Sequence, residues 1–514
     1  MSNSRTKNVY LIFFSSCIRQ IFVLITTFVI RTIFIKTLGV EYLGVNGLFT
    51  NILSLLALSE LGIGTAIAFY LYKPIENNDI ERIKILMDFY KICYRIVGIV
   101  IICVGILIIP LLPYVVNFNS ELNINLYVIY ILYIINTASS YLLFAYKQTF
   151  LLANQQQYKV ENVSTIFCVV QFIFDFINIA LFKNFYLYLV GDIIAILIKN
   201  IMISKVADKS FPFLRNKSKD TLTKQEIKTL FHNIFSVSIF KIGSQLFNAT
   251  DNIIISIILG TTVVGYYSNY YLFISYAMLF VGMIMKAFTA GIGNVSVKED
   301  KETIFKIYKR VDFIMFIIST VVSVCMCQLF NSFMKIWLGA NDESYFFEQV
   351  VIFILSFDFY INCSCQTANT FREATGNFKS GQWLQLIGGV LNVLLSLILG
   401  YGCGIIGIFL ATIISKITIT VTPFLCGIAK SVFDKKPIVI LLDYYKKMIV
   451  RTFIVVIVWY MCKSIHMTDI LGFVIETIIS IFVTIVAIFI FYFRTDEFKH
   501  LLRKIKECII ERNI

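Results

Sequence analysis

Charged residues are scarce in this chain. Only 15% of its 514 residues are Asp, Glu, Lys or Arg, whereas 58% are hydrophobic and the mean hydropathy is +0.81. A soluble domain carries roughly 25% charged residues, so this chain has too little polar surface to be wetted on every side. The composition excludes a soluble globular protein and predicts an all-α polytopic membrane protein.

Residue patterns typical of metal and cofactor sites are also missing. The three histidines, His232, His466 and His500, are widely scattered, and most of the twelve cysteines lie inside apolar runs, where they pack as small hydrophobic residues. Cys363 and Cys365 form a C-x-C pair, but no histidine cluster accompanies them. We therefore predict no metal, no cofactor and no enzyme. The first apolar run is too long for a cleaved signal peptide and lacks a small-residue cleavage site, so it is expected to remain as a span.

Long apolar runs, by contrast, are abundant. A membrane span needs about 20 predominantly apolar residues. The sequence contains about fourteen such runs, expected near 10–35, 43–71, 94–116, 126–146, 163–182, 186–204, 234–259, 266–292, 311–334, 348–371, 384–401, 404–428, 449–464 and 470–493.

The distribution of Lys and Arg gives these spans an orientation. If the amino terminus is inside, the inner connections and the two termini hold 35 of the 45 Lys and Arg. The opposite connections hold only Lys36, Lys183, Lys335 and Lys463. Because Lys and Arg accumulate on the cytoplasmic side of membrane proteins, both termini are predicted to be cytoplasmic. The same asymmetry accounts for the net charge of +14 without a nucleic-acid partner.

One basic stretch divides the chain. Residues 205–233 hold seven Lys and Arg against three acidic residues and form the longest soluble-looking run. We predict a cytoplasmic linker here, between an N-terminal lobe of six spans (1–204) and a C-terminal lobe of six spans (234–428). Residues 429–514 would add two spans and an amphipathic cytoplasmic tail.

Three inner segments look amphipathic and basic. They begin at Asp79, Asp434 and Thr495, and each alternates apolar residues with Lys and Arg at helical spacing. Such helices usually lie on the anionic inner leaflet, which makes membrane lipids the expected contact. Docking of a partner protein is the alternative.

Both halves carry the same short motif. Residues 38–44 and 259–265 each read LG-x4-G, lie 221 residues apart, and join the first and second spans of their half. Internal repeats of this kind are typical of transporters, in which one half rocks against the other. The sequence thus predicts two pseudo-symmetric lobes around a central cavity.

The same offset relates polar residues that the motif does not contain. Gln20, Thr27 and Arg31 share one helical face of the first span, and the offset converts them to the polar set Lys241, Asn248 and Asn252 of the seventh. Ionisable groups at membrane depth normally face a bundle interior or a watery cavity. These faces are therefore expected to line the cavity.

Three cations are the best candidates for binding substrate: Arg31, Lys241 and Lys286. Arg19 lies about 120° away from Arg31 around the first span and could bind substrate or anchor the membrane interface. Buried structural pairing is the alternative for the other cations. A positively lined cavity repels inorganic cations and suits a phosphate or pyrophosphate head, because Arg binds phosphate in bidentate fashion and Lys acts as a point charge.

Several acids could accompany these cations. Glu60 and Asp251 are natural charge partners. Four single acids within spans could be structural or proton-coupled: Asp175, Asp192, Asp358 and Glu476. Lys416 could line the cavity or reach the interface.

The run from Phe49 to Asp79, FTNILSLLALSELGIGTAIAFYLYKPIENND, carries a resemblance to a known family. It resembles Wzx-type polysaccharide flippases of the multidrug/oligosaccharidyl-lipid/polysaccharide exporter superfamily, most specifically in Ser59–Gly64 and in Tyr72-Lys73-Pro74. Fourteen spans in two halves with the amino terminus inside are similar to that superfamily over the whole chain.

The resemblance implies a function. It implies alternating-access movement of undecaprenyl-pyrophosphate-linked oligosaccharide across the bacterial cytoplasmic membrane for capsule, O-antigen or teichoic-type polysaccharide, with proton or sodium coupling and with other polysaccharide-assembly proteins as further partners. Lipid II flippases resemble the same plan, with cavity arginines in spans comparable to those of Arg19 or Arg31 and of Lys286. The alternatives are a multidrug or cation antiporter, a lipid II flippase, and a membrane enzyme such as a polymerase.

Overall fold

The computed structural model describes residues 2–57, 63–116, 124–142, 144, 146–154, 156–218, 220–298, 300–338, 346–375, 381–462 and 470–512. These residues are almost entirely helical, and no strand occurs among them. The prediction of an all-α polytopic membrane protein is confirmed. The chain divides into two compact units, Met1–Ser268 and Asn269–Ile514; the domain boundaries expected from the sequence stay a prediction.

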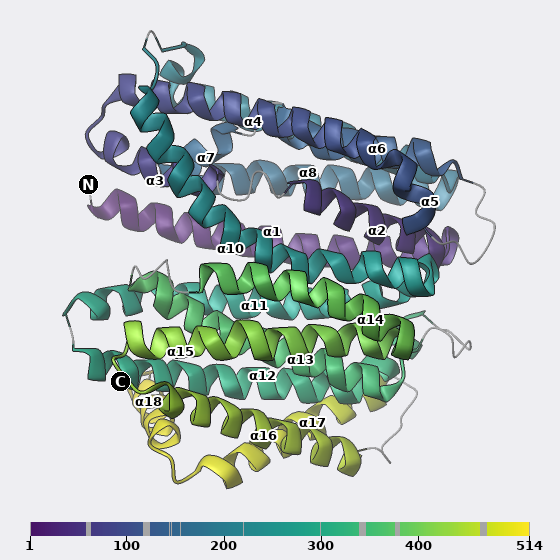
Figure 1. The fold of residues 1–514 in the computed structure, drawn as a ribbon, viewed down its shortest axis with the longest axis vertical. Coiled ribbons are helices and arrows are strands. Elements are labelled where there is room, and N and C mark those ends of the chain that lie inside the picture. Colours follow the sequence, from purple (N-terminus) through teal and green to yellow (C-terminus); the bar gives the residue numbers. More distant parts are fainter. Residues whose placement is uncertain are drawn as a thin grey trace. The chain divides into compact units, whose positions relative to one another are not determined.

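The first unit is built from long helices that lie along one another. Within it, α1 packs along α8, and α4 lies beside α6 (Figure 1). Its helices are α1 (Ser2–Thr37), α2 (Val40–Leu56), α3 (Ile63–Glu76), α4 (Ile80–Ile108), η2 (Ile109–Leu111), α5 (Leu112–Val115), α6 (Leu126–Leu142), α7 (Tyr146–Ala153), α8 (Gln157–Ile177), η3 (Asn178–Phe182), α9 (Phe185–Ser210), η4 (Pro212–Arg215), α10 (Lys224–Leu259) and the start of α11 (Thr261–Lys298).

The second unit contains the rest of α11 and packs around α12, which contacts α13, α16 and α17 (Figure 1). Its helices are α12 (Lys301–Leu338), α13 (Gln349–Ala374), α14 (Gln382–Ser415), η6 (Lys416–Val421), α15 (Thr422–Ser431), α16 (Pro437–Cys462), α17 (Ile470–Tyr492) and α18 (Asp496–Arg512).

Nine helices of the described part are long and apolar enough to cross a membrane, or ten if the bent pair α6 and α7 forms one span. The sequence predicted about fourteen spans, and specific residues account for part of the difference. Gly404, at φ 60°, bends the 49-residue segment Trp383–Ser431, which covers two predicted spans. In addition, α16 carries four charged residues within its apolar sequence.

The structure of α16, in the second unit, contradicts one prediction made from the sequence. The segment that begins at Asp434 was expected to be a separate surface helix, but α16 runs without a break from Pro437 to Cys462. Lys447 and Arg451 are only 4% and 2% exposed. The amphipathic pattern here marks a face that packs against protein, so the prediction of a separate surface helix is wrong. The prediction is wrong in the same way for the segment that begins at Asp79, because α4 runs without a break from Ile80 to Ile108 and buries Ile83, Met87 and Tyr90. The expected tail helix does form, as α18.

The predicted linker is largely ordered. It begins within α9 and includes η4. The backbone N–H of Ser218 donates to Asp88 of α4 at 2.9 Å, and Arg82 of α4 pairs with Glu226 of α10 at 2.6 Å. These contacts tie the linker to the start of α4, whose first turn is capped by Asp79 as the sequence predicts.

The first turn of α10 is fixed by a capping box. The Thr223 side chain accepts from the Glu226 N–H, and the Glu226 carboxylate accepts from the Thr223 N–H at 2.8 Å. These bonds to Thr223, followed by the Arg82 guanidinium, lower the pKa of Glu226 from 4.5 to about 2. Because the pKa is lower in the folded state, this contribution to stability is present above pH 4.5 and is lost as the pH falls toward 2.

The capping box gives a local prediction. Thr223→Ala should cost about 1 kcal/mol of helix stability, which corresponds to roughly fivefold faster hydrogen exchange in the first turn of α10. Exchange measured by mass spectrometry on the purified protein checks this. The matched control is Thr221→Ala, an exposed threonine outside the capping box. Equal exchange in the two variants would contradict the capping role.

Candidate functional site

A polar pocket lies inside the first unit, around Arg31. Its volume is about 270 Å³, and residues of α1, α2, α8 and α9 line it. The polar lining residues include Thr27, Arg31, Asn46, Gln171, Asp175 and Tyr188. We call this the Arg31 pocket.

Two acids beside the Arg31 pocket, Asp192 and Asp175, differ in their hydrogen bonds. Asp192 of α9 accepts a hydrogen bond from the Gln171 side chain. Asp175 of α8 is only 5% exposed, and its Oδ1 atom has no hydrogen-bond partner among the described residues. A carboxylate oxygen in this position, beside empty volume and an arginine, can accept a proton or a small cation. The sequence had no means of ranking Asp175 above the other single acids.

A second pocket of about 310 Å³ surrounds Arg19. The Arg19 guanidinium forms an ion pair with Glu161 of α8, which also accepts from the Gln157 side chain at 3.0 Å. Lys199 of α9 lines this pocket as well. We call it the Arg19 pocket.

The two pockets are neighbours. Val23, Cys168 and Gln171 line both of them. The interface between α1, α8 and α9 therefore contains polar side chains along its length, from Arg19 to Asp175. Arg19 and Arg31 were alternative candidates for binding substrate in the sequence. Both lie along this interface, and each has a carboxylate in its pocket.

The other predicted site residues are spread over the first unit and α11. Gln20 is half-buried on α1, and Asp251 and Asn252 are buried on α10. Lys241 and Asn248 lie on α10 and Lys286 lies on α11, but their side chains lie outside the described residues, as does all of Glu60. Part of one predicted polar face lies within the described residues. There, the Gln245 side chain of α10 donates to the Ser54 hydroxyl of α2 at 3.4 Å. The central cavity and its lining stay a prediction.

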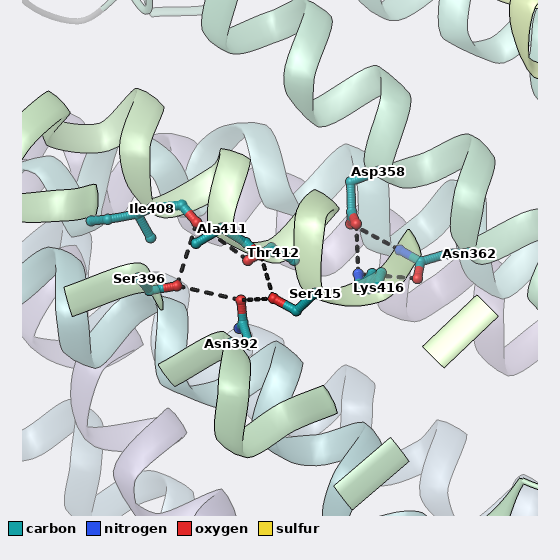
Figure 2. A network of polar contacts seen from close by, with 9 residues as sticks. All are labelled: Asp358, Asn362, Asn392, Ser396, Ile408, Ala411, Thr412, Ser415 and Lys416. Atoms are coloured by element: carbon teal, nitrogen blue, oxygen red, sulfur yellow. Dashed lines mark hydrogen bonds and ion pairs between the residues drawn. The ribbon is translucent and has the colours of Figure 1, made fainter. Parts of the chain in front are cut away.

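The second unit has a polar network of its own (Figure 2). Lys416 donates to Asp358 of α13 at 2.6 Å and to Asn362 at 3.2 Å, and Asn362 donates back to Asp358 at 2.9 Å. Lys416 begins the π-helical segment η6, a helix distortion that is frequent at functional sites. Its charge is compensated by Asp358, so Lys416 is a weaker candidate for binding an anion.

Beside this ion pair lies a neutral set of buried groups. The Asn392 side-chain oxygen accepts from Ser415 at 3.3 Å and from Ser396 at 3.4 Å, and Thr412 donates to the Ile408 carbonyl at 3.4 Å (Figure 2). The bond from Ser415 to Asn392, and one from the Ser396 hydroxyl to the Ile408 carbonyl at 3.5 Å, connect the two arms of α14 across the bend at Gly404. They satisfy polar groups that lipid could not satisfy.

Buried charged side chains attach α16 and α17 to the other helices of the second unit. Most of these pairs were not predicted from the sequence. Lys447 bonds to Asp312 of α12 at 2.6 Å and to Asp443 at 2.7 Å. Arg451 donates to the Ser356 carbonyl of α13 at 2.6 Å, and Glu476 of α17 accepts from Gln328 of α12 at 2.6 Å. Glu476 is thus a structural acid here. The i, i+4, i+8 spacing of Asp443, Lys447 and Arg451 was the available signal.

Comparison with known proteins identifies the fold. No family model matches the chain, and no curated protein matches its sequence. Among solved structures, one described as lipid II flippase MurJ in an inward closed conformation aligns with a TM-score of 0.67 at 17% identity, covering 93% of this chain and 98% of the other.

Two further solved structures share this architecture. An inward-facing multidrug resistance MATE family transporter of the MOP superfamily aligns with a TM-score of 0.63 at 16% identity, covering 80% of this chain and 93% of the other. A MOP superfamily transporter from Pyrococcus furiosus, described as having a binding pocket of reverse polarity, aligns with a TM-score of 0.52 at 15% identity, covering 80% and 96%. At these identities the likeness shows a shared fold.

Proposed function

We propose that this protein is a flippase that moves undecaprenyl-pyrophosphate-linked oligosaccharide units across the bacterial cytoplasmic membrane for surface polysaccharide assembly. The observation that carries the proposal is the fold, which matches a structure described as a lipid II flippase over nearly the full length of both chains. The Lys and Arg distribution supports a cytoplasmic position for both termini.

The chemistry of the predicted cavity suits a pyrophosphate. Arg31, Lys241 and Lys286 would bind it, and Arg19, Gln20, Asn248 and Asn252 would provide further polar contacts. Arginine presents a planar fork of donors to phosphate oxygens, and lysine adds a mobile point charge. Rocking of the two halves would then expose the bound head first to one leaflet and then to the other.

Coupling to an ion gradient would act through the Arg31 pocket. Arg31 and Asp175 line the same 270 Å³ pocket, and in our proposal an ionised Asp175 would attract the guanidinium that the substrate needs. A proton or sodium ion bound at Asp175 would weaken that attraction and release Arg31 for the anionic substrate. Glu60 and Asp251 are the remaining candidates for charge partners.

Asp175→Asn tests this coupling. Asparagine imitates the neutral carboxyl, so we expect flipping in proteoliposomes to continue without a gradient but to lose its acceleration by a proton or sodium gradient. The rate is measured with each gradient imposed separately, which identifies the ion. Asp220→Asn, which removes an exposed carboxylate of the linker, is the control. A gradient response equal to that of the unmodified protein would contradict a coupling role for Asp175.

A lipid II flippase is the second candidate, favoured by the same structural match. Supplying lipid II and a lipid-linked oligosaccharide in separate vesicle preparations distinguishes the two, because the preferred substrate is moved faster. A cation antiporter would call for an acidic cavity, which the basic faces disfavour. A polymerase would have to form glycosidic bonds, and the same vesicles would then contain longer sugar chains.

A further inference from the structure

The Arg19 pocket carries more positive than negative charge. Arg19 and Lys199 line it together with a single acid, Glu161. Both carboxylate oxygens of Glu161 are engaged, one by the Arg19 guanidinium and the other by the Gln157 side chain at 3.0 Å. Lys199 of α9 forms no hydrogen bond or ion pair with any described residue. The pocket of about 310 Å³ therefore has one cation whose charge no described group compensates.

The Arg19 pocket lies at the depth of the inner leaflet. α1 ends at Thr37 and α9 begins at Phe185, and the Lys and Arg distribution assigns both of these helix ends to the outer side. At a rise of about 1.5 Å per residue, Arg19 lies about 27 Å and Lys199 about 21 Å along its helix from that end. The hydrocarbon core is about 30 Å thick, so both cations lie in its inner half. A cation at this depth is costly unless an anion accompanies it.

The walls of the Arg19 pocket offer both polar and apolar contacts. Gln148 of α7 and Ser164 of α8 line the pocket and can donate hydrogen bonds to an anion. On the same stretch of α9 as Lys199, Ile194 and Ile198 are 50% and 46% exposed. A ligand with a charged head and an apolar tail would find partners for both parts here.

The arrangement of charges favours a singly charged phosphate. Glu161 contacts Arg19 through the Nε atom, which leaves the two terminal guanidinium nitrogens directed to other partners. Two parallel donors of an arginine match two phosphate oxygens, and a lysine adds a point charge. Since Glu161 neutralises one of the two cations, the pocket has an excess of one positive charge. That excess equals the charge of a phosphodiester and is smaller than the charge of a pyrophosphate.

We propose that the Arg19 pocket is a binding site for an anionic phospholipid of the inner leaflet, with its phosphate held by Arg19 and Lys199. This lipid is a resident ligand, and its site lies within the first unit alone. Bound there, it compensates Lys199 and joins α1 and α9 across α8. The inference goes beyond the proposed function, because the lipid would occupy the pocket whatever the protein transports.

Lipid binding to the purified protein tests the site directly. Native mass spectrometry in detergent, during titration with phosphatidylglycerol, should show one bound lipid at concentrations at which phosphatidylcholine does not bind. Lys199→Gln and Arg19→Gln should each weaken this binding at least tenfold. The matched control, Lys205→Gln, removes an exposed cation of the same helix and should leave the binding unchanged. Equal binding by Lys199→Gln and Lys205→Gln overturns the site.

A further variant separates lost binding from a damaged fold. Glu161→Gln removes the carboxylate that competes with phosphate for Arg19, so it should tighten phosphatidylglycerol binding several-fold. Damage to the fold does not produce such a gain. Phosphatidylglycerol should also raise the unfolding temperature of the unmodified protein by mass action, and it should leave that of Lys199→Gln unchanged. Weaker or unchanged binding by Glu161→Gln contradicts the proposed contact.

Competition identifies the source of the phosphate. Neither millimolar inorganic phosphate nor an undecaprenyl-pyrophosphate-linked oligosaccharide should displace the phosphatidylglycerol. Displacement by inorganic phosphate would assign the pocket to a free anion, and displacement by the oligosaccharide lipid would assign Arg19 to the transported substrate. Either result overturns a resident phospholipid. A protein that binds phosphatidylglycerol here but moves no lipid-linked substrate overturns the proposed function alone.

Discussion

Replacing Arg31, Lys241 or Lys286 by alanine is expected to abolish export of surface polysaccharide while the protein remains in the membrane at normal levels. Each substitution would leave part of a pyrophosphate without its cationic partner in a site shielded from water. Truncation of one partner in a buried charge pair costs about 2–5 kcal/mol, which is a loss of at least about thirtyfold. Immunoblotting of the polysaccharide and of the protein, in the same cells, measures both quantities.

Two controls sharpen this prediction. Arg31→Lys keeps the charge but removes the bidentate fork, so it should retain intermediate activity. Lys209→Ala removes a linker cation on the inner side and should leave export unchanged. Export retained in all three alanine variants would refute the assignment of these residues.

Removing the Lys447 side chain should destabilise the second unit more than any change in the linker. Lys447 is 4% exposed and lies between Asp312 and Asp443 at 2.6 and 2.7 Å. Lys447→Ala leaves two acidic groups without their cation, and breaking a buried ion pair in this way costs about 3–5 kcal/mol. Thermal unfolding in detergent and the protein level in membranes should both fall.

The neighbouring Lys446 is exposed on the same helix, so Lys446→Ala is the matched control and should be close to neutral. The double variant Asp312→Asn with Lys447→Met should recover part of the loss, because it leaves only Asp443, the more exposed of the two acids, without its cation. A Lys447→Ala protein as stable as Lys446→Ala would show that the ion pair contributes nothing.

Much of the fold could be predicted from apolar runs, charge asymmetry and one repeated motif. The described parts of the runs lie mostly on helices, and the 221-residue offset reappears as direct contact between Glu41 and Thr262. The offset worked because a repeat fixes equivalent positions. The number of spans was harder to predict. The bend at Gly404 and the charges within α16 are local features that hydropathy alone does not resolve.

The site was predictable only in part. Helical spacing indicates which face of a span is polar, but it does not indicate which distant residue completes a pair. Lys416 and Asp358 are 58 residues apart, and Arg19 and Glu161 are 142 apart. Both pairs depend on packing between helices. The same limit hid Asp175, whose Oδ1 atom has no hydrogen-bond partner among the described residues and which lines a pocket together with Arg31.

The most direct measurement is flipping of a labelled undecaprenyl-pyrophosphate-linked oligosaccharide by the purified protein in liposomes, read as accessibility of the sugar to an enzyme added outside. We predict rapid exposure of the inner pool with the unmodified protein and none with the Arg31→Ala, Lys241→Ala and Lys286→Ala variants. An inner pool that stays protected with the unmodified protein, or that is exposed equally by all of the variants, would contradict the account.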